Sequence, residues 1–144
     1  MPQGSQFGSR LGLHVLGTTA LPRYLEQARE AGVTFPVVKC LNDDTAALRE
    51  VKVLSPQTIT VGRVTGADGV LQIISDNPRA DVKALARLMF DETLARLPSG
   101  VLAHMDYLEM INEPAPPDNG WSWRNLALLM IECMSLAEAR DIKL

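Results

Sequence analysis

The sequence predicts an α/β protein with parallel strands. Short, almost wholly apolar stretches alternate along the chain with amphipathic stretches at helical spacing, and each apolar stretch ends in glycine or polar residues. Strands that are apolar on both faces belong in a parallel sheet covered by helices. With 47% apolar and 22% charged residues, the composition is that of a globular domain. We expect one domain over residues 11–144, preceded by a disordered or leader segment over residues 1–10.

The first two strand–helix (βα) pairs are read from apolar periodicity. The run 11–17 predicts a strand, and 19–32 predicts a helix that ends at Gly32. The run 35–42 predicts a second strand. Residues 43–55 open with acidic side chains, which favour a helix N-terminus, and predict the second helix.

The third and fourth pairs are separated by a longer connection. A β-branched run over 58–66 predicts the third strand. In the connection 66–80, the sequence LQII indicates a short strand or a piece of loop packing. A helix is predicted over 81–97, a fourth strand over 105–114 and a fourth long helix over 122–139.

Two architectures have this order of elements, a doubly wound open sheet and a (β/α)8 barrel. A doubly wound nucleotide binder carries a glycine-rich phosphate turn after its first strand, whereas this turn reads GTTALP. A barrel places its chemistry at the carboxyl ends of its strands. This chain has polar groups at those ends, which favours the barrel: Lys39, Asn42, Arg63, Asn112 and Glu113.

The chain contains only half of such a barrel. A complete barrel has eight strands and about 250 residues, whereas four βα pairs are predicted here, and residues 141–144 have the pattern of an opening fifth strand. A half barrel has open strand edges that a protein must cover. We expect the cover to be the remaining half of a longer protein or a second copy in a homodimer.

The end of the fourth strand, YLEMINEP over residues 107–114, resembles a known family. It is similar to clan A of the retaining glycoside hydrolases, whose fourth barrel strand ends in Asn-Glu, commonly followed by proline. The resemblance covers strands one to four. It implies that Glu113 is the general acid/base and that Asn112 binds the sugar 2-hydroxyl. The family's nucleophile is a second glutamate at the end of strand seven, which this chain does not contain.

Retaining hydrolysis requires both carboxylates, one to protonate the leaving oxygen and one, about 5 Å away, to attack the anomeric carbon. We therefore expect the full-length protein to hydrolyse a glycosidic bond and the isolated chain to be inactive. The alternative is a non-catalytic carbohydrate-binding or structural half barrel that dimerises. An Asn-Glu-Pro sequence also makes an ordinary turn at the end of a strand.

Two tryptophans, Trp121 and Trp123, follow the proline-rich loop at the start of the fourth long helix. Aromatic faces stack on sugar rings, so both are candidate substrate-binding residues, and we expect one of them to face the ligand. Packing beneath the helix is the alternative for either residue, because large aromatics dominate core energetics.

Three basic residues complete the candidate site. Period-2 alternation places Glu109 in the barrel interior below the strand end. A buried carboxylate requires a partner, for which Arg63 and Lys39 are candidates. These two bases bind substrate oxygens or form a structural ion cluster. His14 on the first strand is a further substrate-binding candidate. The alternative is that His14 is a core histidine whose hydrogen bonds are made within the protein.

Charge and composition exclude other classes. The 14 basic and 17 acidic residues give a net charge of -3 without a basic cluster, so nucleic acid is not an expected partner. We expect no membrane partner, no metal and no cofactor, and find no signal peptide. Cys40 and Cys133, far apart in apolar stretches, are interpreted as buried thiols, with a disulfide left open.

Overall fold

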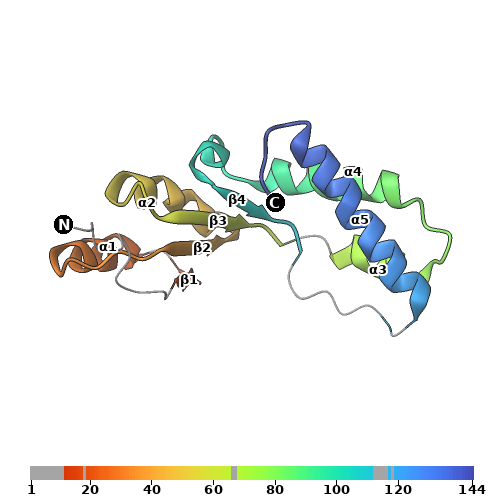
Figure 1. Ribbon diagram of the computed structural model, residues 1–144, viewed down its shortest axis with the longest axis horizontal. Helices are drawn as coiled ribbons and strands as arrows, with labels where there is room; N and C mark the ends of the chain where they lie inside the picture. The colour runs from red at the N-terminus through yellow and green to blue at the C-terminus, as the bar shows by residue number, and fades with distance from the viewer. Residues whose placement is uncertain (1–11, 18, 66–67, 112–116, 118) are drawn as a thin grey trace, which may run out of the picture. The chain divides into compact units, whose positions relative to one another are not determined.

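The computed structural model forms two compact units. Unit 1 comprises Met1–Arg63 and Leu97–Tyr107, and unit 2 comprises Val64–Arg96 and Leu108–Leu144. The structure describes residues 12–17, 19–65, 68–111, 117 and 119–144 (Figure 1). The segment 1–10, interpreted as disordered or a leader, therefore lies outside the described residues.

A parallel sheet of four strands runs through the chain, and the α/β class is confirmed. The strands are β1 (Leu13–Val15), β2 (Val37–Leu41), β3 (Ile59–Arg63) and β4 (Tyr107–Glu109). Their order in the sheet is β1-β2-β3-β4, the same as their order in the sequence (Figure 1). In the register, His14 is opposite Lys39, and Leu41 is opposite Arg63.

The helical segments of unit 1 are α1 (Leu21–Glu30), η1 (Asn42–Ala47), α2 (Leu48–Leu54) and η2 (Val101–His104). The predicted second helix thus begins with a 3-10 turn before it becomes α-helical. Leu21 and Leu25 of α1 and Leu48 and Val51 of α2 bury their side chains in one hydrophobic cluster with Val38 of β2. Since Leu13, Val15, Val38 and Cys40 belong to this cluster, one face of the sheet carries the core of unit 1.

The helix α1 ends with a glycine cap at Gly32, as the sequence predicts. Gly32 has a φ of 69°, in the left-handed region that glycine adopts without steric cost. Its N–H donates to the Arg29 carbonyl at 3.0 Å, and the Val33 N–H donates to the Ala28 carbonyl at 2.7 Å. These two bonds form a Schellman motif, which satisfies carbonyls that the helix end leaves free.

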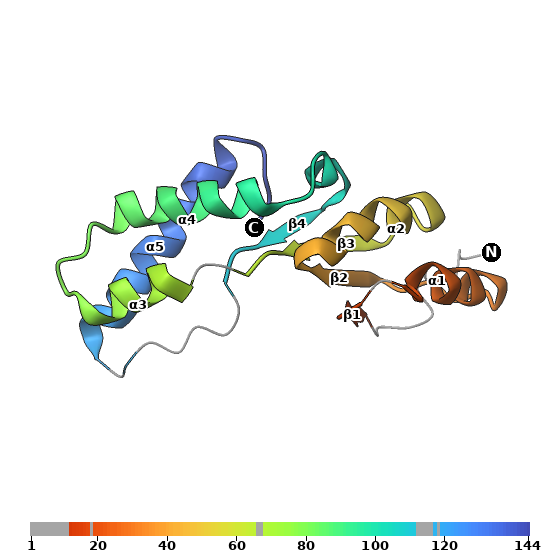
Figure 2. The same cartoon turned by 180° about the vertical axis from the view of Figure 1, so that it is seen from behind.

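Unit 2 consists mainly of three helices that pack together (Figure 2): α3 (Asp68–Asp76), α4 (Val82–Arg96) and α5 (Gly120–Glu138). The interpretation of LQII as a strand or loop packing was wrong, because these residues lie in α3. Val70 and Ile74, four residues apart, are both buried on one side of this helix. The glycines before this stretch and the Asn77-Pro78 pair after it obscured the helical periodicity.

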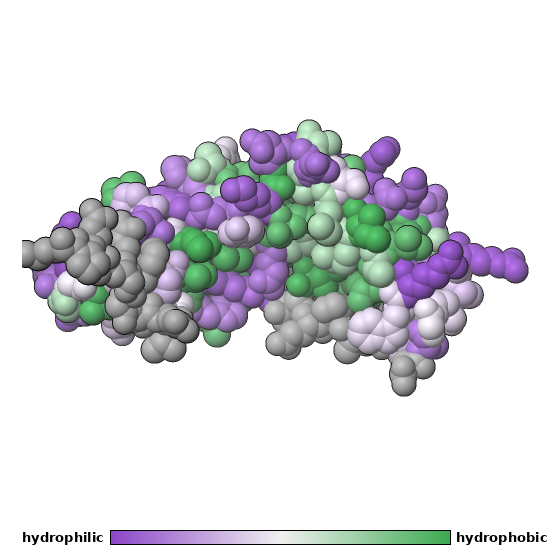
Figure 3. Space-filling model, viewed as in Figure 1, coloured by the Kyte–Doolittle hydropathy of each residue, from purple (hydrophilic) through white to green (hydrophobic). Residues whose placement is uncertain are grey.

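The apolar stripes on the two longest helices are narrower than their sequences predicted. On α4, Leu88 is exposed, whereas Ala86, Met89 and Phe90 are fully buried. On α5, the buried side is made by Leu126, Leu129, Cys133 and Ala137. Leu128, Ile131 and Met134 of the predicted arc are exposed instead, and Figure 3 shows apolar side chains gathered on this surface of α5.

The segment after α5 lies beside β4. The Leu108 N–H donates to the Lys143 carbonyl at 2.8 Å. Residues 142–144 do not form a strand, and this backbone bond links them to β4.

Candidate functional site

The catalytic pair implied by the family resemblance, Asn112 and Glu113, lies outside the described residues. The strand that leads to it is described as far as Ile111. Along this strand Leu108 and Met110 are buried, whereas Tyr107 is exposed and Glu109 half-buried. The predicted period-2 alternation of β4 is therefore confirmed, with Glu109 on the less buried face.

In unit 1, the strands bring the three basic candidates together on the sheet face opposite the hydrophobic cluster. His14 and Lys39 are direct neighbours in the register of β1 and β2. Arg63 is opposite Leu41 on β3, one strand further along and nearer to the carboxyl end of the sheet. His14 is exposed, while Lys39 and Arg63 are half-buried.

This sheet face carries both basic and apolar side chains. The half-buried residues Leu41 and Val61 lie between Lys39 and Arg63, and the half-buried Val37 precedes Lys39 on the same face. Lysine and arginine donate several hydrogen bonds each and accept none. The arrangement can therefore bind oxygen atoms of a ligand over an apolar floor. Both Lys39 and Arg63 also interact with other groups of the protein.

In unit 2, the two tryptophans are in the first turn of α5. This helix begins at Gly120 and is capped by Asn119, whose Oδ1 accepts a hydrogen bond from the Ser122 N–H at 2.8 Å. Such a cap satisfies a backbone donor that the helix start leaves free. Trp121 is half-buried, and Trp123 is 49% exposed. Trp123 therefore has the larger free surface for stacking.

A polar cluster at the amino ends of β3 and β4 was not anticipated from the sequence. Asp106 Oδ2 accepts hydrogen bonds from Lys52 Nζ at 2.6 Å and from the Thr60 N–H at 2.7 Å. Burial opposes ionisation of Asp106, but the hydrogen bonds from Lys52 and Thr60 and the charge of Lys52 outweigh it and lower the pKa of Asp106 below the usual value of an aspartate. These hydrogen bonds join α2, β3 and the start of β4, so we assign this cluster to stability.

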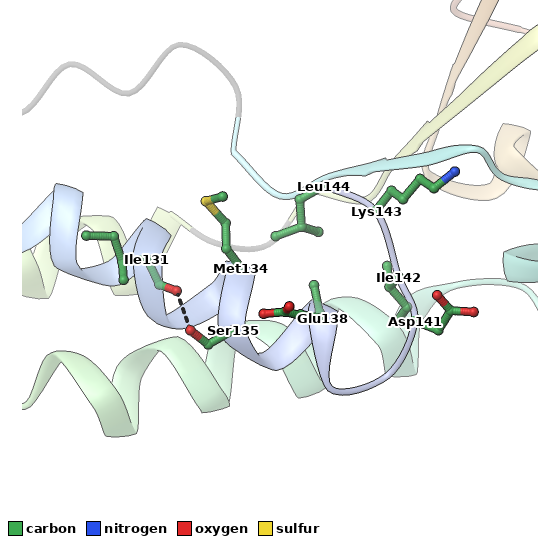
Figure 4. A pocket seen from close by; sticks show the side chains of 9 residues that line it. Ile131, Met134, Ser135, Glu138, Asp141, Ile142, Lys143 and Leu144 are labelled. Carbon is green, nitrogen blue, oxygen red and sulfur yellow. Dashed lines mark hydrogen bonds between the residues drawn. The ribbon is translucent and has the colours of Figure 1, made fainter.

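Two cavities border the described strands and helices. In unit 1, a cavity of about 570 Å³ lies between β1 and α1 and is lined mainly by apolar side chains, among them Leu16, Tyr24 and Val33. In unit 2, a cavity of about 610 Å³ lies between α5 and residues 141–144 (Figure 4). Ser135 Oγ, on its α5 side, donates to the Ile131 carbonyl at 3.1 Å. Neither cavity contains one of the two tryptophans.

Both cysteines are free and buried, as predicted. Burial raises the pKa of Cys40 and of Cys133 to about 11, with a smaller contribution from the neighbouring carboxylates Asp44 and Glu132. Their thiols therefore stay protonated at neutral pH and are poor nucleophiles.

Searches for other functional features and for similar proteins are negative. Within the described ranges, no three or more His, Cys, Asp or Glu side chains are grouped so as to hold a metal ion. Of the helices in the described part of the chain, none has the length and apolar character to span a membrane. No model of a protein family, no curated protein and no solved structure matches the chain.

Proposed function

We propose that this chain is the N-terminal half of a (β/α)8 barrel and that the complete protein is a retaining glycoside hydrolase similar to clan A. The observation that carries the architecture is the strand order β1-β2-β3-β4. In a doubly wound sheet the strand order reverses at a switch point, whereas in a barrel each strand lies beside the next one in sequence. The backbone bond between Leu108 and Lys143 supports a further strand beside β4 in the complete protein.

The proposed chemistry rests on the sequence that follows β4. Glu113 acts as the general acid, protonating the leaving oxygen, and then as the general base for water. Asn112 donates a hydrogen bond to the sugar 2-hydroxyl, which strengthens in the transition state. The nucleophile is a second glutamate in the other half of the barrel, so the isolated chain has no complete catalytic pair.

The remaining residues contribute to substrate binding. His14, Lys39 and Arg63 share the sheet face that becomes the interior of a closed barrel, where they donate to substrate oxygens. Trp123, with about half of its surface free, stacks on a sugar ring. The half-buried Trp121, two residues before it on α5, is the second substrate-binding residue. The substrate is a carbohydrate, and no cofactor or metal takes part.

The test is the substitution Glu113→Gln in the protein encoded by the complete gene. We expect turnover of an aryl glycoside to fall by about 10²- to 10⁴-fold, the usual range for general acid–base catalysis, with an unchanged circular dichroism spectrum. Azide requires no general base, so it should accept the glycosyl group and restore part of the turnover. Exposed Glu138→Gln is the matched control and should retain full activity. Unchanged turnover in Glu113→Gln would contradict the acid/base assignment.

A non-catalytic half barrel that dimerises is the second candidate, favoured by the exposed apolar side chains on α5. It predicts a stable dimer of the 144-residue chain in light scattering and no glycosidase activity in the complete protein. A complete protein that hydrolyses glycosides excludes it.

A further inference from the structure

The helix α3 is an addition to the connection that follows β3. The strands β1 and β2 are each followed by one α-helix, whereas β3 is followed by two, α3 and α4. Since α4 leads on to η2 and β4, α3 is not needed to return the chain to the sheet. In a barrel, the segments between a strand and its helix build the face on which ligands bind. In the proposed barrel, α3 therefore belongs to the face that holds the candidate site.

A buried amide joins the end of α3 to the start of α5, which lie side by side in Figure 1. Asn125 is 6% exposed, and its Nδ2 donates to the Ile74 carbonyl at 3.3 Å and to the Asn77 carbonyl at 3.1 Å. The residue four positions after Ile74 is Pro78, which has no N–H to donate to that carbonyl as a helical residue would. The Asn125 side chain supplies a donor instead, so the end of α3 depends on a residue of α5.

The part of α5 that this amide holds carries the two tryptophans. Trp121 lies four positions before Asn125 and therefore on the same side of the helix. Ser122 is fully buried, and its N–H and Oγ donate to Asn119 Oδ1 at 2.8 and 2.5 Å. Buried polar groups whose hydrogen bonds are satisfied fix one arrangement of the elements that carry them. Trp121 and Trp123 thus lie between two attachments, the cap and Asn125.

We propose that Asn125 is a positioning residue for carbohydrate binding, which fixes the tryptophan turn, residues 119–123, on α3. Asn125 is buried, so it acts through Trp121 and Trp123 rather than on the sugar. Stacking requires an aromatic ring held in a fixed place. Loss of the amide therefore weakens substrate binding and leaves the chemistry of Glu113 unchanged. This inference rests on the proposed function for the identity of the ligand.

Tryptophan fluorescence tests the positioning role without an enzymatic assay. The chain has two tryptophans, so Trp123→Phe leaves Trp121 as the single reporter. In that background we compare Asn125→Ala, Asn125→Leu and Asp106→Ala. Leucine keeps the branched shape of the asparagine side chain without its donor. Asp106→Ala is the matched control, because it removes hydrogen bonds within unit 1 and leaves the tryptophan turn intact.

We expect both Asn125 variants to raise the acrylamide quenching constant of Trp121 at least about twofold, because the turn opens locally, with little change in Asp106→Ala. Unchanged quenching in the two Asn125 variants, or an equal rise in Asp106→Ala, would overturn the inference. Loss of the far-ultraviolet circular dichroism signal in both Asn125 variants would also overturn it, because the amide would then support the whole fold rather than one turn.

Kinetics of the protein encoded by the complete gene test the link to the substrate. Asn125→Ala should raise KM for an aryl glycoside about five- to tenfold and leave kcat within about twofold of wild type. A merely structural role would lower the fraction of folded enzyme, and with it kcat, without raising KM. Trp123→Ala should also raise KM, and the two effects should multiply incompletely in the double variant, because Asn125 acts through the tryptophan turn.

The inference and the proposed function fail in different ways. Hydrolysis that depends on Glu113, together with an unchanged KM in Asn125→Ala, overturns only the inference. Increased quenching of Trp121 in a protein that hydrolyses no glycoside overturns the enzymatic function and leaves the hold of Asn125 on the tryptophan turn supported.

Discussion

The substitution Asp106→Ala tests how the start of β4 is held to β3. One carboxylate oxygen of Asp106 accepts hydrogen bonds from Lys52 and from the Thr60 N–H. Thr60 is fully buried, so water has no access to the N–H that loses this acceptor. Lys52 retains its bond to the Thr58 carbonyl at 2.8 Å. The loss of stability therefore comes mainly from two changes: the buried Thr60 N–H loses its acceptor, and the ion pair with Lys52 is lost.

The magnitude follows from these contacts. A buried donor that loses its acceptor costs about 1–3 kcal/mol, and a partly exposed ion pair adds at most about 1 kcal/mol. The Lys52 and Asp106 side chains are 22% and 36% exposed, so solvent screens their attraction and the lower part of the ion-pair range applies. We expect Asp106→Ala to lower the free energy of unfolding by about 2 kcal/mol and Asp106→Asn, which keeps an acceptor oxygen, by about 1 kcal/mol.

Urea unfolding followed by far-ultraviolet circular dichroism measures both values. A loss of about 2 kcal/mol corresponds to a midpoint lower by about 1 M for a protein of this size. Asp91→Ala is the matched control. Asp91 pairs with Arg140 at 3.0 Å on the exposed surface of unit 2, and its loss should cost less than about 1 kcal/mol. An Asp106→Ala variant that is no less stable than Asp91→Ala would refute the reasoning.

Three further predictions follow from the packing. Because the pKa of Asp106 is lower in the folded protein than in the unfolded chain, its ionic contribution is complete well above the pKa of an unfolded aspartate and is lost as the pH falls through the folded pKa. The difference in urea midpoint between wild type and Asp106→Asn should therefore close in acid; a constant difference would contradict this. Gly62→Ala should destabilise by about 1–3 kcal/mol in thermal unfolding, because an added Cβ meets the side chain of Met105. Met105→Ala should relieve that cost in the double variant. Asn125→Ala should cost about 1–3 kcal/mol in the same assay, because its buried amide donates to two carbonyls at the end of α3; Asn125→Asp should not rescue it.

Much of the fold could be predicted because its signals are local. Apolar runs that end at Gly17, Asn42 and Gly66 correspond to β1, β2 and β3, each within a few residues. The end of α1 was predictable because Gly32 adopts a left-handed backbone that other residues avoid. The α3 helix was missed because its glycines and its short length weaken a periodicity that only packing against α4 and α5 makes decisive.

The candidate site, too, could be predicted from the sequence only in part. That His14, Lys39 and Arg63 lie on three successive strands is visible in the sequence, but that they share one sheet face depends on how the strands are paired. That His14 and Lys39 are direct neighbours depends on the strand register. The roles of Asn112 and Glu113 stay predictions from the family resemblance, since both lie outside the described residues.

The sequence by itself determined the alternation of parallel strands and helices, the buried state of the two thiols and the polar residues that follow the strands. These properties depend on residues close together in the chain, whose spacing sets which side of a strand or helix is apolar. Only the tertiary structure decided the strand order, the cluster of Lys52, Thr60 and Asp106, and which apolar positions of α5 stay in solvent. Those properties depend on contacts between residues that are far apart in the chain. An apolar periodicity carries no information about what packs against it.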